Sequence, residues 1–327
     1  MKKKLFLAGT LALCLFGITA CSKDSGSSSQ IEKGDGIKVM LTVSDGSDSF
    51  RKLLVAAAED AAGQAGMEID VQDAAGSTES QMNHIKNAKD ADVIICALCD
   101  SGTAQEMEVL AGDTPIVFIN SCPAEDYLEA EKYVYVGSDE EVAGKLQADY
   151  VLDKYSSKSE LNVAIIKGES THSATKGRTK AAKATLEASG KKINYVYEDF
   201  ADWSTDTAKD MFNLFLRTGQ PVDCVISNND SMAIGIVQSA EENDLDFDDL
   251  PILGVDATPD GLDAVENGQM ACTIYQPAKG QGEAAVKAAI KLVKGESITK
   301  LEGAEDNGLY VWVPFESVTK SNVSSYR

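Results

Sequence analysis

One pattern recurs along this chain from residue 37 onward: a short β-branched apolar run, a polar or glycine-bearing break, then an amphipathic stretch of helical length. The first copy reads IKVMLTV, then SDGSDS, then FRKLLVAAAEDAAGQAG. Further apolar runs are MEIDVQD, ADVIICAL, TPIVFIN, NVAIIKG, INYVYED, DCVISN, PILGVD and ACTIYQ. Continuous apolar strands alternating with helices are typical of parallel sheets covered on both faces. The sequence therefore predicts an α/β protein, and nine or ten strands fit two sheets in two lobes more economically than one.

The polar breaks are where we expect function, because ligands of open α/β sheets bind beyond the carboxyl ends of the strands. In ISNNDSMAIG, Asn228, Asn229 and Asp230 stand where a buried strand gives way to a helix. One short polar side chain is enough to cap that helix. One or two of the three are then free to face a ligand, although capping alone is the simpler explanation of this motif.

The other breaks carry side chains of the same kinds. They supply amides, carboxylates, one imidazole, one guanidinium and two aromatic rings: Asp48 and Phe50 in VSDGSDSF, Asn120 in FINSCP, His172 and Arg178 in GESTHSATKGR, Trp203 in DFADWSTD, Asp256 in GVDATPDG and Gln276 in TIYQPAKG. This set suits a pyranose or similar polyol, because each hydroxyl donates and accepts while aromatic rings cover the C–H faces. Hydrogen bonds to charged groups contribute about 1.5–3 kcal/mol each, so a few support micromolar binding.

These motifs carry a resemblance to a known family. From about residue 36 to its end, the chain resembles the type I solute-binding proteins of bacterial sugar ABC transporters, in the ribose- and glucose/galactose-binding group: NNDSMAIG, GVDATPDG, FADW, SDGSDSF and TIYQPAKGQG fit in order and spacing. The resemblance implies two Rossmann-like lobes with parallel sheets, a sugar held between them, and three hinge crossings near Ser138, Gln276 and Glu305. It divides the chain into an N-terminal lobe of residues 37–138 with 277–305 and a C-terminal lobe of residues 139–276 with 306–327.

The resemblance also implies which residues bind the ligand: Asp48, Phe50, Asn120, His172, Arg178, Trp203, Asn229, Asp256 and Gln276, with Phe50 and Trp203 stacking on the ring. Galactose binders have an Asp two residues after the His, where this chain has Ala174, and their calcium loop before NVAIIKG is missing. Ribose binders have an Asp-Arg pair where Asn120 and Ser121 stand. We expect a hexose such as glucose or galactose, with ribose, xylose, inositol or an autoinducer-like furanose as alternatives. Arg51 follows Phe50 and is a candidate to reach the ligand, but a solvated helix residue is the preferred interpretation.

The N-terminus predicts export. Three lysines precede LFLAGTLALCLFGI, an apolar stretch too short for an ordinary membrane span, so residues 1–20 are interpreted as a signal peptide. Residues 18–21 resemble a bacterial lipobox, which implies cleavage before Cys21 and lipidation of its sulfur; an ordinary cleaved signal is the alternative. Several acyl chains anchor a protein stably, whereas one does so only marginally. The Ser/Gly-rich segment 21–36 is expected to be a flexible tether. We expect a monomeric extracytoplasmic lipoprotein, anchored to the membrane through Cys21, that delivers its ligand to an ABC transporter permease.

Charge and motif content argue against other classes of protein. With 30 basic against 52 acidic residues, the net charge of −22 opposes nucleic-acid binding. The cysteines lack paired spacing and a neighbouring His, so we expect neither a disulfide framework nor a metal site, and no cofactor. No GxSxG motif is present, and an enzyme is not expected, although Asp48 and Asp256 leave a glycosidase-type acid pair open. A lactose-repressor-type regulator shares this fold but begins with a helix-turn-helix, where this chain has an export signal.

Overall fold

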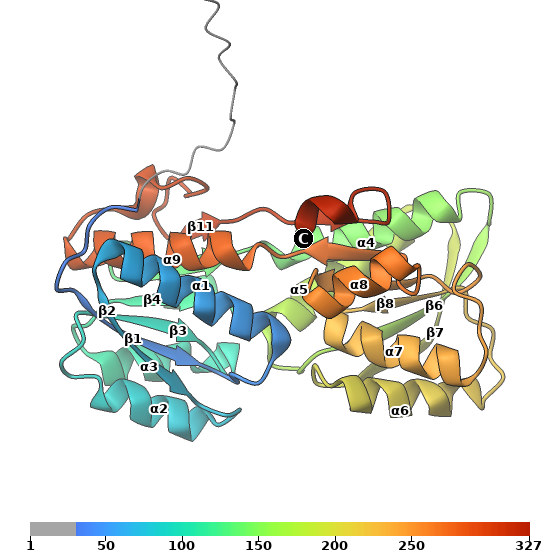
Figure 1. The fold of residues 1–327 in the computed structure, drawn as a ribbon, viewed down its shortest axis with the longest axis horizontal. Coiled ribbons are helices and arrows are strands. Elements are labelled where there is room, and N and C mark those ends of the chain that lie inside the picture. The colour runs from blue at the N-terminus through green and yellow to red at the C-terminus, as the bar shows by residue number, and fades with distance from the viewer. Residues whose placement is uncertain (1–30) are drawn as a thin grey trace, which may run out of the picture. The chain divides into compact units, whose positions relative to one another are not determined.

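The computed structural model describes residues 31–327, which form one compact unit containing two six-stranded sheets (Figure 1). The predicted signal peptide and Cys21 lie outside the described residues. Every neighbouring pair of strands in the first sheet is parallel, in the order β11-β5-β4-β3-β1-β2. Its strands are β1 (Lys38–Val43), β2 (Glu68–Asp73), β3 (Val93–Ala97), β4 (Ile116–Ile119), β5 (Tyr133–Gly137) and β11 (Tyr310–Trp312).

Helices cover both faces of the first sheet, as the continuous apolar runs predict. The covering helices are α1 (Ser49–Ala65) with α9 (Ala278–Val293) on one face and α2 (Thr78–Asn87) with α3 (Ala104–Ala111) on the other. Successive residues of β3 enter opposite cores: Ile95 packs beneath α1 and α9, whereas Ile94 packs beneath α2 and α3. A strand with two buried faces has no polar side, and this explains the run VIICA. We call this sheet with its four helices the first lobe.

The second sheet has the order β12-β10-β9-β8-β6-β7 and is parallel except for its edge strand β12. Its strands are β6 (Glu160–Lys167), β7 (Lys192–Phe200), β8 (Cys224–Ser227), β9 (Ile252–Asp256), β10 (Cys272–Tyr275) and β12 (Glu316–Val318). One face is covered by α4 (Glu140–Lys154) and α5 (Ser173–Ala188), the other by α6 (Thr205–Leu216), α7 (Asp230–Glu242) and α8 (Pro259–Asn267). This sheet with its five helices is the second lobe. The predicted α/β class with two mainly parallel sheets is confirmed.

The chain passes between the lobes three times: after β5, after β10, and between β11 and β12. Ser138 Oγ donates to the carbonyl of Val313 at 2.5 Å and accepts from Gln281 Nε2 at 2.8 Å, so the three passages are hydrogen-bonded together. The third passage lies beyond the expected position near Glu305. Because β11 pairs with β5, residues 310–312 belong to the first sheet rather than to the second lobe.

Two local features also differ from the sequence expectations. Residues 31–36, expected in the flexible tether, lie against the first lobe. Ile31 packs on its core, the Gly34 N–H donates to Ala65 O at 2.9 Å, and Glu32 pairs with Lys291 of α9 and with Lys294, which follows that helix. An apolar side chain and ion pairs hold this segment in place. Strands β5, β11 and β12 were not among the predicted apolar runs. For β11 and β12 the reason is length and pairing: each spans three residues, and each pairs with a strand from a distant part of the chain.

Candidate functional site

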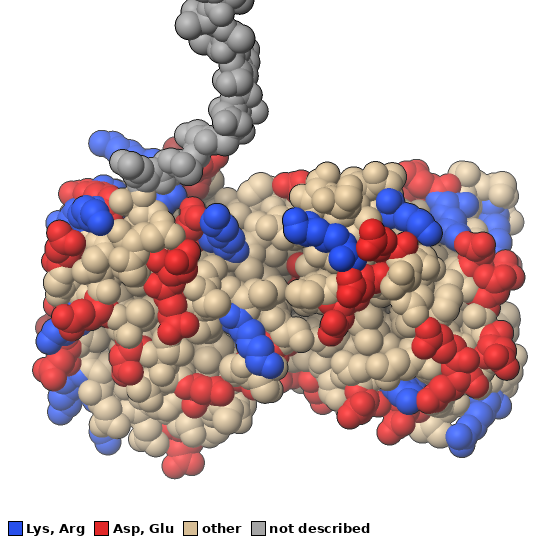
Figure 2. Space-filling model, viewed as in Figure 1, with Lys and Arg blue, Asp and Glu red and all other residues tan. Residues whose placement is uncertain are grey.

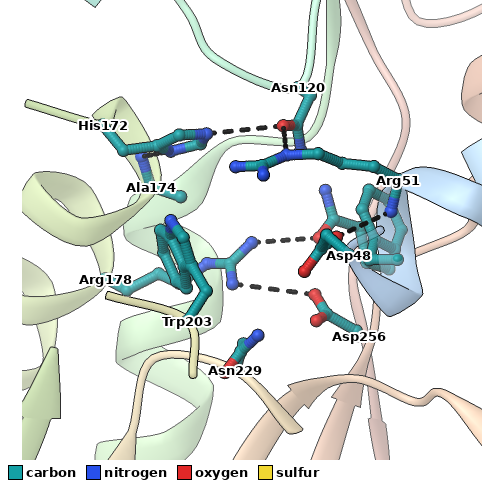
Figure 3. A pocket seen from close by; sticks show the side chains of 11 residues that line it. Asp48, Arg51, Asn120, His172, Ala174, Arg178, Trp203, Asn229 and Asp256 are labelled. Carbon is teal, nitrogen blue, oxygen red and sulfur yellow. Dashed lines mark hydrogen bonds and ion pairs between the residues drawn. The ribbon is translucent and has the colours of Figure 1, made fainter. Parts of the chain in front are cut away.

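A pocket lies where segments following the strands of both sheets meet (Figure 3). Its lining residues are Asp48, Phe50, Arg51, Asn120, His172, Ala174, Arg178, Trp203, Asn229, Asp256 and Gln276. The structure thus brings all nine predicted ligand-binding residues together, and adds Arg51 and Ala174. The lining combines aromatic faces with charged and amide groups drawn from both lobes, which is typical of a site for one small polar ligand.

The first lobe supplies Asp48, Phe50, Arg51 and Asn120, which we call the first-lobe wall. Asp48 caps α1, its Oδ1 accepting from the Arg51 N–H at 2.8 Å, and Phe50 follows on the first turn, only 3 % exposed. One carboxylate oxygen is therefore used by the helix, and the other remains available to a ligand. Asn120 follows β4 directly.

The second lobe supplies His172, Ala174, Arg178, Trp203, Asn229 and Asp256, which we call the second-lobe wall. The Trp203 ring lies edge-on to the His172 ring, with centroids 5.2 Å apart. A Cβ added at Gly168, directly after β6, would lie 2.1 Å from the Trp203 ring. Only glycine at position 168 therefore lets this ring lie where it lines the pocket.

Arg178 is held on all sides by the protein. Its Nε donates to Glu140 Oε2 at 2.5 Å, its Nη1 to the Asn228 carbonyl at 2.6 Å and its Nη2 to Gln276 Oε1 at 3.0 Å. Asp256 Oδ1 lies 3.7 Å from Nη1. With 3 % of its surface exposed, the side chain is a fixed positive group that joins the second lobe to the passage carrying Gln276.

The three polar residues that follow β8 divide their roles. Asn229 caps α7 through Oδ1, which accepts from the Met232 N–H at 3.0 Å, and it lines the pocket as well. Asn228 accepts from the Gly168 N–H, and Asp230 accepts from Thr258 and Thr273, so both bind the protein itself. Capping and ligand exposure are therefore combined in the single residue Asn229.

Backbone strain concentrates around this pocket. Among residues 31–327, eight residues other than glycine have a positive φ, and three of these line the pocket: Asn120 at 60°, Trp203 at 65° and Asp256 at 113°. Such conformations cost of order 1–3 kcal/mol each and persist where the surroundings impose them. Their clustering at strand ends is typical of a binding site rather than of connecting loops.

Burial sets the protonation of two pocket residues. Burial, followed by the charges of Arg51 and Arg178, holds the pKa of His172 well below its usual value, so the imidazole is neutral. Its Nδ1 accepts from the Ala174 N–H at 3.2 Å, so the proton is on Nε2, which faces Asn120 Oδ1 at 3.4 Å. Burial also raises the pKa of the Asp256 carboxyl well above its usual range, against the lowering effect of Arg178.

Arg51 is the pocket residue whose interpretation from sequence was wrong. It was expected to be solvated, yet it is 4 % exposed and its Nε donates to Asn120 Oδ1 at 3.2 Å. One signal in the sequence could have identified it: a basic residue in the first turn of a helix opposes the helix dipole, and α1 has no acidic residue there. Ala174 stands where galactose binders have an acid, and it gives the pocket an apolar position.

The two lobes touch directly beside the pocket. Ser101 Oγ of the first lobe donates to the Thr171 carbonyl of the second at 2.6 Å, and the Cys122 N–H donates to Ser173 Oγ at 2.8 Å. The contact of Asn120 with His172 crosses the same boundary. The pocket is therefore held in a closed arrangement, with a wall from each lobe.

Other chemistry is sparse in the part of the chain that the structure describes. Within residues 31–327, no group of three His, Cys, Asp or Glu side chains could hold a metal ion. The five cysteines of this region are free thiols, and Cys99 and Cys122 are only partly buried. Figure 2 shows acidic side chains spread over both lobes, with basic side chains interspersed among them. No helix from residue 31 onward has both the length and the apolarity that a membrane span requires.

Comparison with known proteins identifies the family to which this chain belongs. Residues 39–297 match the family model described as a periplasmic binding protein domain. A putative rhizopine-binding protein of Rhizobium meliloti is 32% identical over 86% of this chain and 89% of its own. The D-galactose/methyl-galactoside binding periplasmic protein MglB of Haemophilus influenzae is 29% identical over 65% of this chain and 66% of its own.

Among solved structures, an ABC transporter solute-binding protein from Bacillus halodurans with bound myo-inositol superposes with a TM-score of 0.79 at 28% identity. The superposition covers 89% of this chain and 97% of that one. These relatives are solute-binding proteins rather than enzymes, and the family acts outside the cytoplasm. The chain therefore belongs to the type I periplasmic binding proteins that bind sugars for bacterial ABC transporters.

Proposed function

We propose that this protein captures one hexose-sized ring, with glucose and galactose as the first candidates, and delivers it to an ABC transporter permease. One observation carries the proposal: two aromatic rings, two carboxyl groups, two guanidiniums and three amides from both lobes line one pocket. The aromatic faces suit the C–H faces of a pyranose, and the polar groups suit its hydroxyls. Both lobes contribute contacts, so the ligand favours the closed arrangement over an open one.

A cyclitol such as inositol is the second candidate, and two features of the pocket favour it. Ala174 removes the acid that galactose binders have at this position, and Arg51 adds donors close by. The similar protein from Bacillus halodurans holds myo-inositol, a ring with hydroxyls on every carbon. A ring with no exocyclic carbon would leave more of its hydroxyls within reach of these charged groups.

A ligand screen tests the proposal. Purified protein lacking residues 1–20 is heated with glucose, galactose, ribose, xylose, myo-inositol and an autoinducer-like furanose, and calorimetry then gives Kd for each ring that raises the melting temperature. A ligand at 100 times its Kd stabilises the folded state by about 2.7 kcal/mol, which is readily visible as a shift. Hexoses or cyclitols should bind most tightly. A preference for ribose would contradict the hexose-sized ring, and binding of none would contradict the function.

The membrane anchor is a separate part of the proposal. We propose that Cys21 carries lipid and that the protein acts as a monomer beside its permease. Mass spectrometry of the N-terminal peptide should find Cys21 as the first residue with a diacylglycerol mass. The Cys21→Ala variant should be released from cell membranes while its ligand affinity is unchanged. Release of the unaltered protein to the same extent would contradict the anchor and leave the ligand proposal standing.

A further inference from the structure

We infer that Arg51 is a specificity-determining residue of this pocket, and that its two terminal nitrogens donate to two adjacent oxygens of the bound ring. The inference rests on the proposed function, because it takes the ligand to be a ring bearing hydroxyls. It adds a residue that the family resemblance did not supply. It also names the part of the ligand that this residue recognises.

The two arginines of the pocket differ in what they are bonded to. Arg178 uses all three of its nitrogens on Glu140, Asn228 and Gln276. Arg51 uses its Nε alone, on Asn120, and neither Nη1 nor Nη2 has a partner among the residues that the structure describes. No carboxylate in the described chain pairs with it at ion-pair distance, whereas Arg178 has two. Four N–H groups of Arg51 are therefore left for something else.

Burial makes this arrangement costly without a ligand. Arg51 is 4 % exposed, so water satisfies little of its hydrogen-bonding capacity. A buried guanidinium without partners destabilises the folded state, and its position on the first turn of α1 adds repulsion from the helix dipole. Nothing in the packing of α1 demands a charge at this position. Residues that break local rules in this way are expected at functional sites, where a ligand supplies the missing contacts.

The direction of the side chain agrees with this role. Figure 3 shows the Arg51 guanidinium extending from α1 across the pocket toward His172 and Ala174 of the second lobe. The charge of Arg51 contributes to lowering the pKa of His172, which places the two groups close together. Ala174 presents only a methyl group to the pocket, and the nearby carboxylates of Asp45 and Glu169 form no ion pair with Arg51 within the described residues.

The geometry of a guanidinium specifies the ligand group. Its planar fork matches two oxygens held side by side, as in a vicinal diol or a carboxylate. We assign the neutral diol, because Asp48 already lines the pocket and the chain carries a net charge of −22. An anionic ring would meet repulsion both on approach and in the pocket. The Asp48 and Asp256 carboxylates can then accept from the hydroxyl hydrogens of other ring positions.

The test compares discrimination between ligands rather than affinity alone. The best-binding ring from the screen is compared with its singly deoxygenated analogues and with a uronate of the same size, in the unaltered protein, Arg51→Met and Arg51→Lys. The neighbouring Lys52 is exposed, so Lys52→Met is the matched control. The unaltered protein should discriminate roughly 10- to 100-fold against loss of either of two adjacent hydroxyls. Arg51→Met should lose discrimination at these two positions and keep it at the other ring positions. Arg51→Lys should retain part of it, because one ammonium replaces the fork.

A measurement without ligand separates this role from a structural one. If Arg51 is kept for the ligand, Arg51→Met should raise the melting temperature of the empty protein; a packing role would lower it. Equal discrimination by the unaltered protein and Arg51→Met would overturn the inference while the proposed function stands. Tighter binding of the uronate would overturn the neutral diol. If the unaltered protein binds no ring at all, the proposed function fails and this inference fails with it.

Discussion

The two walls of the pocket differ in how firmly the protein holds their polar groups. In the second-lobe wall, Arg178 is bonded through every nitrogen, and His172 and Asn229 each cap a helix with one side-chain atom. In the first-lobe wall, Arg51 has one bond and Asp48 keeps one carboxylate oxygen unused. The polar groups of the second-lobe wall are therefore held in position before the ligand binds, which lowers the entropic cost of binding. In the first-lobe wall the ligand supplies the missing hydrogen-bond partners, so we expect this wall to discriminate between ligands.

The largest expected effect comes from breaking the second-lobe wall at its charge pair. Glu140→Gln leaves Arg178 buried without its closest counter-charge, since Glu140 Oε2 lies 2.5 Å from Arg178 Nε and both side chains are under 10% exposed. Removing one partner of a buried pair typically costs about 3–5 kcal/mol. Urea denaturation of the ligand-free protein should show a loss of unfolding free energy of that order.

The adjacent residue provides the control for this experiment. Glu141 of α4 pairs with Lys180 of α5, but their side chains are 55% and 73% exposed. Exposed pairs contribute only about 0–1 kcal/mol, so Glu141→Gln should leave stability nearly unchanged. Equal losses in the two variants would show that the second-lobe wall is no more firmly built than the surface.

The next effect concerns ligand contact within the same wall. Asp256→Asn should weaken binding by about 2–4 kcal/mol, because a carboxyl group in contact with ring hydroxyls is replaced by an amide beside Arg178. Calorimetry with the best-binding ring measures this change. Asparagine also tolerates the positive φ at position 256.

Asp230→Asn is the matched variant for Asp256→Asn. Both carboxylates are buried at strand ends of the second lobe, but Asp230 bonds only to Thr258 and Thr273 and does not line the pocket. It should lower the melting temperature and leave Kd close to that of the unaltered protein. If Asp256→Asn behaves in the same way, Asp256 is a structural residue and the ligand is held by other groups.

The same contrast between the walls explains what the sequence could predict. Strand ends are local features: an apolar run followed by a polar residue marks the edge where ligands bind, and the nine predicted residues line one pocket for this reason. The third passage between the lobes was misplaced because β11 is three residues long and its partner β5 lies far away in the sequence. Pairing of that kind is decided by the assembled sheet rather than by propensity.

The burial of Arg51 was not predicted, for a different physical reason. Helix residues after a cap are usually solvated, and only the assembled second lobe buries this one against His172 and Ala174. Its unfavourable place in the helix dipole was visible, but a single charge of this kind contributes typically 0.3–1 kcal/mol and is a weak signal. The residues held by their own loop were therefore predictable, and the residue whose environment depends on the opposite lobe was not.

The smallest expected effect concerns the contact between the walls themselves. Ser101 and Ser173 join the lobes by hydrogen bonds, and neither lines the pocket. Each alanine substitution removes a bond present only in the closed arrangement, so each should weaken ligand binding by about 0.5–1.5 kcal/mol without touching the ligand. Ser317→Ala, at an exposed position of β12, should have no effect. Calorimetry on the two single variants and the double variant should give losses of binding free energy that add, because the two hydrogen bonds share no partner. Unchanged affinity in the double variant would mean that the ligand alone holds the first-lobe wall against the second.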